Sequence, residues 1–510
     1  MLTKLKSAIN IGLEVEFVDV EVDVSSGLPR ISLAGLPDTA IKESKDRVES
    51  AVRNSGFSFP KDKITINFAP AGVKKEGVFF DLGVALGLLG STGQVSRSYL
   101  KEYLFIGELS LDGSLRRVNG VLPIALALRD SPIKKIILPY ENAQETSVIK
   151  GIETYPLKSL SEAVSFLNKE IEISAYEKDI TSLTERPVYA VDFSEVKGQH
   201  FVKRALEIAA SGSHNVLLIG PPGSGKTMLA KRLPTILPDM EFEEALETAK
   251  IYSVAGLLRG NSSLIAERPF RNPHHTCSSV SLVGGGSFPK PGEVSLANNG
   301  VLFLDELPEF KRDSLEVLRQ PLEDGIVTVA RVRKTLKYPA KFLLIATMNP
   351  CPCGYFGYEK KGHVCRCSPN QIQKYRHKIS GPLLDRIDIH IEVPFVESGR
   401  LINDDDEGEP SLEIRKRVNQ AREIQKERFK RFKIFFNSQM SHSQVRRFCR
   451  IPPETKGFLK NAVDELGFSA RAYDKILKIS RTIADLSAEE GIQPSHIAEA
   501  VQYRSLDKTF

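Results

Sequence analysis

The sequence has no long hydrophobic run. Over its 510 residues, no run approaches the roughly 20 apolar residues that a helix needs to cross a bilayer. The first residues, Met1–Lys6, also lack the apolar segment of a secretory signal peptide. These absences predict a cytoplasmic protein with no membrane partner. The formal net charge of +6 is small for this length, so it permits nucleic-acid binding without requiring it.

Cysteine is scarce as well, and its distribution is uneven. Of six cysteines, four lie in one short segment as two Cys-x-Cys pairs: Cys351, Cys353, Cys365 and Cys367. In a chain that we expect in the cytoplasm, this clustering favours a metal over disulfides. Four thiolates would complete one tetrahedral Zn²⁺ site without an open position, so the zinc would be structural. Free thiols remain the alternative, because the gap within each pair is one residue and not the usual two.

The chain is too long for a single hydrophobic core, and its patterning predicts a multidomain α/β protein. Residues 1–170 alternate β-rich and helical segments, residues 171–190 are polar and predict a linker, and residues 191–400 form a second α/β domain. After the acidic tract 404–410, residues 411–510 have helical spacing nearly throughout. In the first domain the β-rich runs are 15–24, 63–69, 103–109 and 135–138, and the helical stretches are 40–55, 80–89, 120–129 and 159–168.

A phosphate-binding loop is predicted at Gly220-Pro221-Pro222-Gly223-Ser224-Gly225-Lys226-Thr227. An apolar run precedes it and a helix-forming segment follows, which is the context that such a loop requires. The glycines let backbone N–H groups turn toward the β- and γ-phosphates, Lys226 neutralises their charge, and Thr227 can ligate Mg²⁺. The sequence therefore predicts binding of a nucleoside triphosphate with Mg²⁺.

A second apolar run, residues 301–304, ends in two acids, Asp305 and Glu306. Asp305 is expected to hold Mg²⁺ through water, and Glu306 to orient and deprotonate the attacking water. A strand followed by an acidic turn is common in proteins. Its pairing with the phosphate-binding loop favours the catalytic interpretation.

Three more residues have the placement of ATP-sensing groups in an AAA+ core. Asn349 ends another apolar run, as a sensor 1 residue does, and would contact the γ-phosphate or the lytic water. Arg386 is a candidate arginine finger for the ATP of a neighbouring subunit, and a surface ion pair with Asp385 or Asp388 is the alternative. Arg471 lies at a helix start, where a sensor 2 arginine would reach back over the nucleotide, and an ordinary surface arginine is its alternative.

Together with longer motifs, these residues carry a resemblance to the Mg-chelatase-like AAA+ ATPases of the YifB/ComM family over essentially the whole chain. The resemblance implies ATP and Mg²⁺ as ligands, a C-terminal helical lid, and a hexameric ring with ATP sites shared between subunits. It also implies a helix-2 insert at 274–292 and a hairpin at 324–342, both facing the pore, while 192–199 resembles the segment that wraps the adenine. His274 and His275 are not expected to bind metal, because adjacent histidines seldom point into one site. The most specific motifs are RPFRNPHHT at 268–276, LVGGGS at 282–287, PGE at 291–293, MNPCPCG at 348–354 and RTIADL at 481–486.

Part of the first domain resembles the Lon-type protease domain, a ribosomal S5-like fold, in residues 68–77 and 106–113. Peptidase chemistry in that family needs a lysine that deprotonates a serine nucleophile. Here Phe79 stands about where the serine should be, and Leu122 or Pro123 where the lysine should be. We therefore expect a domain without peptidase activity that acts as a scaffold or contacts DNA.

Two basic segments are candidates for DNA contact. Arg331, Arg333 and Lys334 would lie at the tip of the pore hairpin that the resemblance implies. The segment 415–433 carries nine basic side chains that could follow a phosphate backbone, although a solvated helix face is the ordinary explanation for such a run.

The resemblance implies a cytoplasmic homo-hexameric motor that couples ATP hydrolysis to translocation on single-stranded or branched DNA. It would promote branch migration when incoming single strands are integrated. The alternative is a motor of the magnesium-chelatase kind, which remodels a protein partner for metal insertion into a porphyrin. Stimulation of ATP hydrolysis by DNA would separate the two hypotheses.

Overall fold

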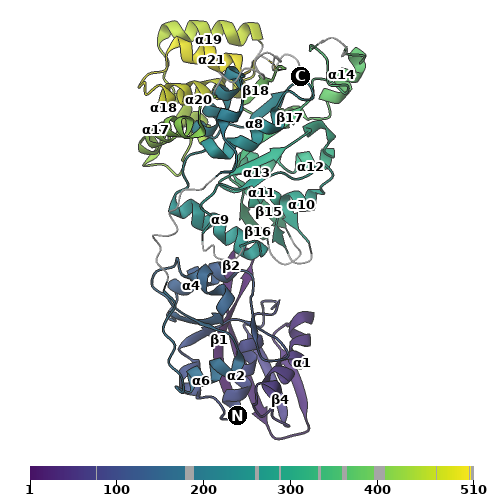
Figure 1. Ribbon diagram of the computed structural model, residues 1–510, viewed down its shortest axis with the longest axis vertical. Helices are drawn as coiled ribbons and strands as arrows, with labels where there is room; N and C mark the ends of the chain where they lie inside the picture. Colours follow the sequence, from purple (N-terminus) through teal and green to yellow (C-terminus); the bar gives the residue numbers. More distant parts are fainter. Residues whose placement is uncertain are drawn as a thin grey trace. The chain divides into compact units, whose positions relative to one another are not determined.

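The computed structural model describes residues 1–75, 77–177, 189–258, 264–286, 289–330, 335–358, 364–395, 408–466, 468–504 and 506 (Figure 1). The chain forms two units. The first comprises Met1–Arg186 and Ala245–Ala266, and the second comprises Pro187–Glu244 and Glu267–Phe510. Residues 245–266, predicted as part of the second α/β domain, cluster with the first unit. Among the described residues, no helix combines the length and apolar character that crossing a bilayer requires.

The first unit contains a seven-stranded sheet in the order β3-β4-β2-β1-β5-β8-β9. β1 (Leu2–Ile11) pairs antiparallel along its whole length with β2 (Glu14–Ser25), from Leu2 with Asp23 to Ile11 with Glu14. The buried helix α2 (Asp81–Ser91) packs closely on them, since an ideal Cβ at Gly87 would lie 2.6 Å from Val22 Cγ2. The other elements are β3 (Arg30–Ala34), α1 (Thr39–Asn54), β4 (Lys63–Ala69), α3 (Arg97–Leu100), β5 (Tyr103–Phe105), β6 (Glu108–Leu109), β7 (Leu115–Arg116), α4 (Val121–Arg129), β8 (Lys135–Pro139), α5 (Ala143–Thr146), β9 (Glu153–Leu157) and α6 (Leu160–Leu167).

Apolar side chains occupy the positions compared with a Ser-Lys dyad. Leu122 is fully buried on α4, and Phe79 is half-buried. Neither side chain can act as a nucleophile or a base. The positions therefore contribute to the hydrophobic core of the first unit.

The second unit is built on a parallel sheet in the order β11-β14-β17-β10-β18. Its three central strands, β14 (Val301–Leu304), β17 (Leu343–Met348) and β10 (Val216–Ile219), consist of buried residues only. Such continuous burial is typical of parallel strands covered on both faces. The carboxyl ends of the strands meet at one edge of the sheet, where ligands bind in open α/β folds. The outer strands are β11 (Phe270–Arg271) and β18 (Ile389–Glu392).

Shorter elements surround this sheet. An antiparallel hairpin, β15 (Ile326–Ala330) and β16 (Thr335–Pro339), precedes β17. Helix α9 (Phe242–Ala255) passes from the second unit into the first at Ala245. The remaining elements are α7 (His200–Gly212), α8 (Lys226–Arg232), α10 (Ser279–Val283), β12 (Gly284–Gly285), β13 (Lys290–Pro291), α11 (Glu293–Leu296), α12 (Arg312–Glu316), α13 (Arg319–Asp324), α14 (Pro369–Arg376) and α15 (Gly381–Leu384), with 3₁₀ turns at Phe193–Glu195, Leu233–Ile236 and Leu307–Glu309. A further 3₁₀ turn, Tyr140–Asn142, belongs to the first unit.

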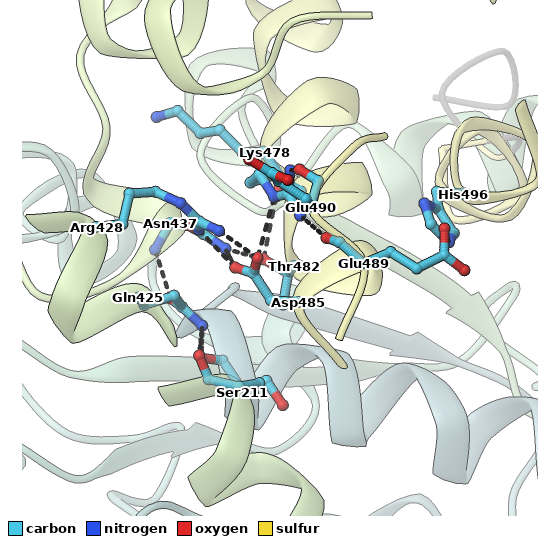
Figure 2. A network of polar contacts seen from close by, with 12 residues as sticks. Ser211, Gln425, Arg428, Asn437, Lys478, Thr482, Asp485, Glu489, Glu490 and His496 are labelled. Atoms are coloured by element: carbon cyan, nitrogen blue, oxygen red, sulfur yellow. Dashed lines mark hydrogen bonds and ion pairs between the residues drawn. The ribbon is translucent and has the colours of Figure 1, made fainter. Parts of the chain in front are cut away.

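The C-terminal part of the second unit is helical, as predicted, and a buried polar network holds it together (Figure 2). The carboxylate of Asp485 accepts hydrogen bonds from Arg428, Arg481 and Asn437. Gln425 then joins this network to α7 by donating to the carbonyl oxygen of Ser211 at 2.9 Å. The lid helices are therefore fixed to the core by satisfied buried polar groups as well as by apolar packing. They are α17 (Ser411–Phe429), the 3₁₀ turn η6 (Asn437–Gln439), α18 (His442–Phe448), α19 (Pro453–Leu466), α20 (Ala470–Leu486) and α21 (Pro494–Gln502).

Candidate nucleotide-binding site

The predicted phosphate-binding loop joins β10 to α8 at the carboxyl edge of the parallel sheet. Gly223 and Gly225 adopt φ values of +77° and +87°, which non-glycine residues rarely occupy. An ideal Cβ at Gly220 would lie 2.3 Å from the carbonyl oxygen of Val393 on the neighbouring chain segment. The glycines are thus required by backbone conformation and by close approach, as a phosphate-binding loop demands.

Lys226 begins α8, and its side chain lies across the loop. Its Nζ donates hydrogen bonds to the carbonyl oxygens of Gly220 (2.7 Å) and Pro221 (2.8 Å) and contacts Oδ1 of Asn349 at 3.3 Å. Burial lowers the pKa of Lys226 to about 8, and the two carboxylates that follow β14 limit this fall. The structure therefore joins the predicted loop lysine and the predicted sensor 1 asparagine in one site.

Two threonines hold the carboxylate of Asp305 at the end of β14. The hydroxyl of Thr227 donates to Oδ2 at 3.0 Å, and the hydroxyl of Thr347 donates to Oδ1. The second contact follows from strand register, because Leu304 pairs with Ala346 and the next residues are adjacent. These hydroxyl and carboxylate oxygens are the hard ligands that Mg²⁺ prefers.

Thr347 is a residue of this site that the sequence analysis does not identify. The available signal is its position as a buried hydroxyl in an otherwise apolar strand. Its hydroxyl also accepts a hydrogen bond from the backbone N–H of Glu306 at 3.1 Å. Thr347 therefore positions both acids that follow β14.

Glu306 turns its side chain toward solvent. Its backbone has φ +55°, a left-handed conformation that is uncommon for a non-glycine residue. The carboxylate lies 3.9 Å from Nδ1 of His275, whose ring lies beside that of His274 with centroids 4.1 Å apart. The predicted base is thus held at the end of the strand with one histidine of the insert next to it.

The segment expected to wrap the adenine also contacts the loop. Nε2 of Gln199 donates to the carbonyl oxygen of Ser224 at 2.8 Å. Upstream, the carboxylate of Asp192 accepts the backbone N–H of Ser411, the first residue of α17. The segment 192–199 therefore connects the phosphate-binding loop with the first lid helix.

The two predicted arginines lie apart from this group. Arg386 donates to the carbonyl oxygen of Pro382 at 2.6 Å and pairs with the carboxylate of Glu323. Arg471 is exposed and lies 4.0 Å from Asp385. Among the contacts of the described residues, neither arginine reaches the phosphate-binding loop of its own chain.

The four clustered cysteines converge. The Sγ atoms of Cys351, Cys353, Cys365 and Cys367 all lie within 4.8 Å of one another. Three separations are 3.3, 3.8 and 3.6 Å. A tetrahedron with Zn–S bonds of about 2.3 Å has S–S edges of about 3.8 Å, so this donor set fits Zn²⁺.

The segment that carries the four cysteines, residues 351–367, is called here the cysteine loop, and its described part packs on the phosphate-binding loop. Gly354 has φ +87°, and an ideal Cβ there would lie 2.6 Å from Cδ of Pro222. Asn349, whose side-chain oxygen accepts a hydrogen bond from Lys226, is two residues before Cys351. The cysteine cluster thus continues the strand that carries the sensor residue and covers the loop that would hold phosphate.

The predicted DNA-contacting residues at the hairpin tip, Arg331, Arg333 and Lys334, lie outside the described residues. The hairpin itself is described on both sides of the tip. Its strands pair in register from Ile326 with Pro339 to Ala330 with Thr335.

Most basic side chains of α17 are held within the unit. Arg415 pairs with Asp239 at 2.8 Å, Arg417 pairs with Glu207 at 2.5 Å, and Arg422 is buried. These cations stabilise the packing of the lid on the core. The run 415–433 therefore does not present nine free cations to a phosphate backbone.

Comparison with known proteins places this site in a family. The profiles "Magnesium chelatase, subunit ChlI", "Subunit ChlI of Mg-chelatase" and "Magnesium chelatase, subunit ChlI C-terminal" match residues 192–401, 20–142 and 408–504. The chain is similar to "Competence protein ComM" of Haemophilus influenzae, at 44% identity over 98% of this chain and 97% of that protein. It is also 42% identical to "Uncharacterized protein YifB" of Salmonella typhimurium, over 98% of this chain and 96% of that one. A shorter match, 31% identical over 24% of this chain and 22% of the other, is to "Lon protease 2" of Bacillus subtilis. The chain therefore belongs to the ComM/YifB family of Mg-chelatase-like AAA+ proteins.

Proposed function

We propose that this protein is a ring-forming ATPase that uses ATP hydrolysis to move on DNA and to promote branch migration during recombination. The observation that carries the ATPase part is the convergence of Lys226, Thr227, Asp305 and Asn349 at one edge of the sheet. Membership of a Mg-chelatase-like AAA+ family indicates the same activity.

Each residue has a role in hydrolysis. Lys226 exchanges its carbonyl acceptors for phosphate oxygens, Thr227 would ligate Mg²⁺, and Asp305 would hold Mg²⁺ through water. Mg²⁺ held there would neutralise negative charge on the phosphates. Glu306 accepts a proton from the attacking water, and Asn349 orients that water or the γ-phosphate.

Arg386 completes the site of a neighbouring subunit in this proposal. Support comes from its contacts: those described for Arg386 are with Pro382 and Glu323, and none reaches the phosphate-binding loop of its own chain. In a ring, one subunit supplies the loop and the next supplies the arginine. Arg471 reaches the nucleotide from the lid when the site closes.

The cysteine cluster holds one structural Zn²⁺ in this proposal. Support comes from the convergence of the four Sγ atoms within 4.8 Å of one another and from three separations of 3.3, 3.8 and 3.6 Å, close to the edge of about 3.8 Å in a ZnS₄ tetrahedron. Four protein ligands leave no open position on the metal, so the zinc stabilises the loop and takes no part in the reaction.

DNA as the substrate is supported by the name of one relative, a competence protein, and by the basic tip of the β15–β16 hairpin. The second candidate is a motor that remodels a protein partner, favoured by the match to magnesium-chelatase subunits. Both hypotheses require ATP hydrolysis, and they differ in what stimulates it.

Variants of the hairpin tip test whether DNA or a protein partner is the substrate. A variant with Arg331, Arg333 and Lys334 changed to Ala should keep basal ATP hydrolysis, lose stimulation by branched DNA, and show a flatter salt dependence of DNA binding. The matched control changes three exposed cations after α17, Lys430, Arg431 and Lys433, to Ala. DNA stimulation that survives in the tip variant and is lost in the control would overturn the hairpin assignment.

A further inference from the structure

The guanidinium of Arg386 is folded against its own chain. Its side chain is 14% exposed, Nη1 donates to the carbonyl oxygen of Pro382 at 2.6 Å, and Nη2 pairs with Glu323. Its Nε is buried and has no hydrogen-bond acceptor among the described residues. The described hydrogen bonds of the guanidinium are therefore all made within its own chain.

Glu323 is placed among arginines. Its pKa lies below the usual range, first because of the hydrogen bond from Arg386 and also because of the charges of Arg471 and Arg319. Arg386 and Arg471 are the two arginines that the proposed function assigns to ATP. One carboxylate thus interacts with both of them, and it is itself 58% exposed.

Glu323 is also close to the hairpin in the chain. It is the second-last residue of α13, and Gly325, with φ +66°, turns the chain into β15. The turn is held on both sides, because Gly325 donates to the carbonyl oxygen of Pro321 at 3.0 Å and accepts from Ala340 at 2.9 Å. Glu323 therefore lies two residues before the hydrogen-bonded turn at the base of the hairpin.

We propose that Glu323 is a positioning residue that latches Arg386 in the resting state and links its release to the β15–β16 hairpin. The γ-phosphate of a neighbouring subunit competes with the carboxylate for the guanidinium. When Arg386 turns to that phosphate, α13 loses its ion pair with the Arg386 segment, while the shared apolar packing remains. This inference rests on the proposed role of Arg386 in the neighbouring site.

The test compares Glu323→Gln with Glu316→Gln in the full-length protein. Glu316 lies on α12 and pairs with Arg319 at 3.0 Å, so the control removes an acid of the same region without touching Arg386. The Glu323 carboxylate is exposed, so solvent screens its pairing with Arg386, and its loss should change rates by no more than about fivefold. Glu323→Gln should raise kcat for ATP hydrolysis without DNA by about two- to fivefold, with KM for ATP unchanged, and should reduce the fold stimulation by DNA. Glu316→Gln should resemble wild type.

Equal rates for Glu323→Gln and Glu316→Gln, or a lower rate for Glu323→Gln, would overturn the latch. The role of Arg386 is checked separately by mixing Arg386→Ala chains with Lys226→Ala chains. In equal random mixtures about a quarter of the interfaces keep both groups, so activity should partly return. If both variants are inactive alone and no ATPase activity returns on mixing, Arg386 does not act in a neighbouring site. The latch then loses its basis.

Discussion

Replacing Gly354 with Ala should inhibit ATP hydrolysis although the residue contributes no side chain to the site. Two costs follow from its geometry. The left-handed backbone, φ +87°, costs an alanine about 1 kcal/mol. The new Cβ would also lie 2.6 Å from Cδ and 2.8 Å from Cγ of Pro222, whereas carbon atoms pack at about 3.5–4.0 Å. The phosphate-binding loop or the cysteine loop must then move by about 1 Å, and a displacement of that size at a catalytic site reduces rates by up to about 100-fold.

Gly357 provides the matched control. It lies in the same loop with φ +78°, and an ideal Cβ there meets no atom within 4 Å. Gly357→Ala therefore has the same backbone cost without the contact to Pro222. Steady-state ATPase kinetics and the affinity for a fluorescent ATP analogue should separate the two variants. Equal activity of Gly354→Ala and Gly357→Ala would refute the packing of the cysteine loop on the phosphate-binding loop.

Three further predictions concern the site, the metal and the first unit. Lys226→Ala should abolish nucleotide binding. Glu306→Gln should bind ATP normally and slow hydrolysis by about 10²- to 10⁴-fold, because it removes only the general base. Equal nucleotide affinity of Lys226→Ala and wild type in an equilibrium titration would contradict the assignment of residues 220–227 as the phosphate-binding loop. Metal analysis of protein purified without chelator should find about one zinc per chain, and the zinc should be lost when Cys351 and Cys353 are both changed to Ser. A zinc content far below one per chain, with all six thiols accessible to a thiol reagent, would show that the four clustered cysteines bind no metal. Burial raises the pKa of Asp81 to about 7 although its ion pair with Arg47 lowers it, so the free energy of unfolding should fall as pH rises between about pH 4 and 7, by at most about 1.4 kcal/mol per pH unit. Asp81→Asn should remove this pH dependence of stability, which hydrogen exchange in β1 and β2 can measure. Identical pH profiles for the variant and the wild type would disprove the role of Asp81.

Local motifs of the nucleotide site could be predicted from the sequence because each is a short contiguous segment. The phosphate-binding loop and the two acids after β14 can be recognised from the order and spacing of a few neighbouring residues. The contact of Thr347 with Asp305 could not be predicted, since it requires β14 and β17 to be neighbours in a particular register. The pairing of Arg386 with Glu323 likewise depends on tertiary structure.

The strand β1 shows why part of the fold escapes sequence patterning. Its buried face includes Thr3 and Ser7, so the apolar alternation that indicates a strand is weak. Both hydroxyls are satisfied by distant partners: Ser7 donates to the carbonyl oxygen of Phe105, and Thr3 accepts from Ser91. Polar residues can occupy a core face when such partners exist, and the partners are visible only in the folded chain.

The most direct test of the proposed function is the ATPase rate of the wild-type protein with and without DNA. Branched and single-stranded DNA should each raise the rate, with Lys226→Ala inactive under all conditions as the control for contaminating ATPases. Stimulation should weaken as salt increases, because phosphate contacts release counterions. A rate that depends on Lys226 and is unchanged by either DNA at low salt would contradict a DNA motor and favour action on a protein partner.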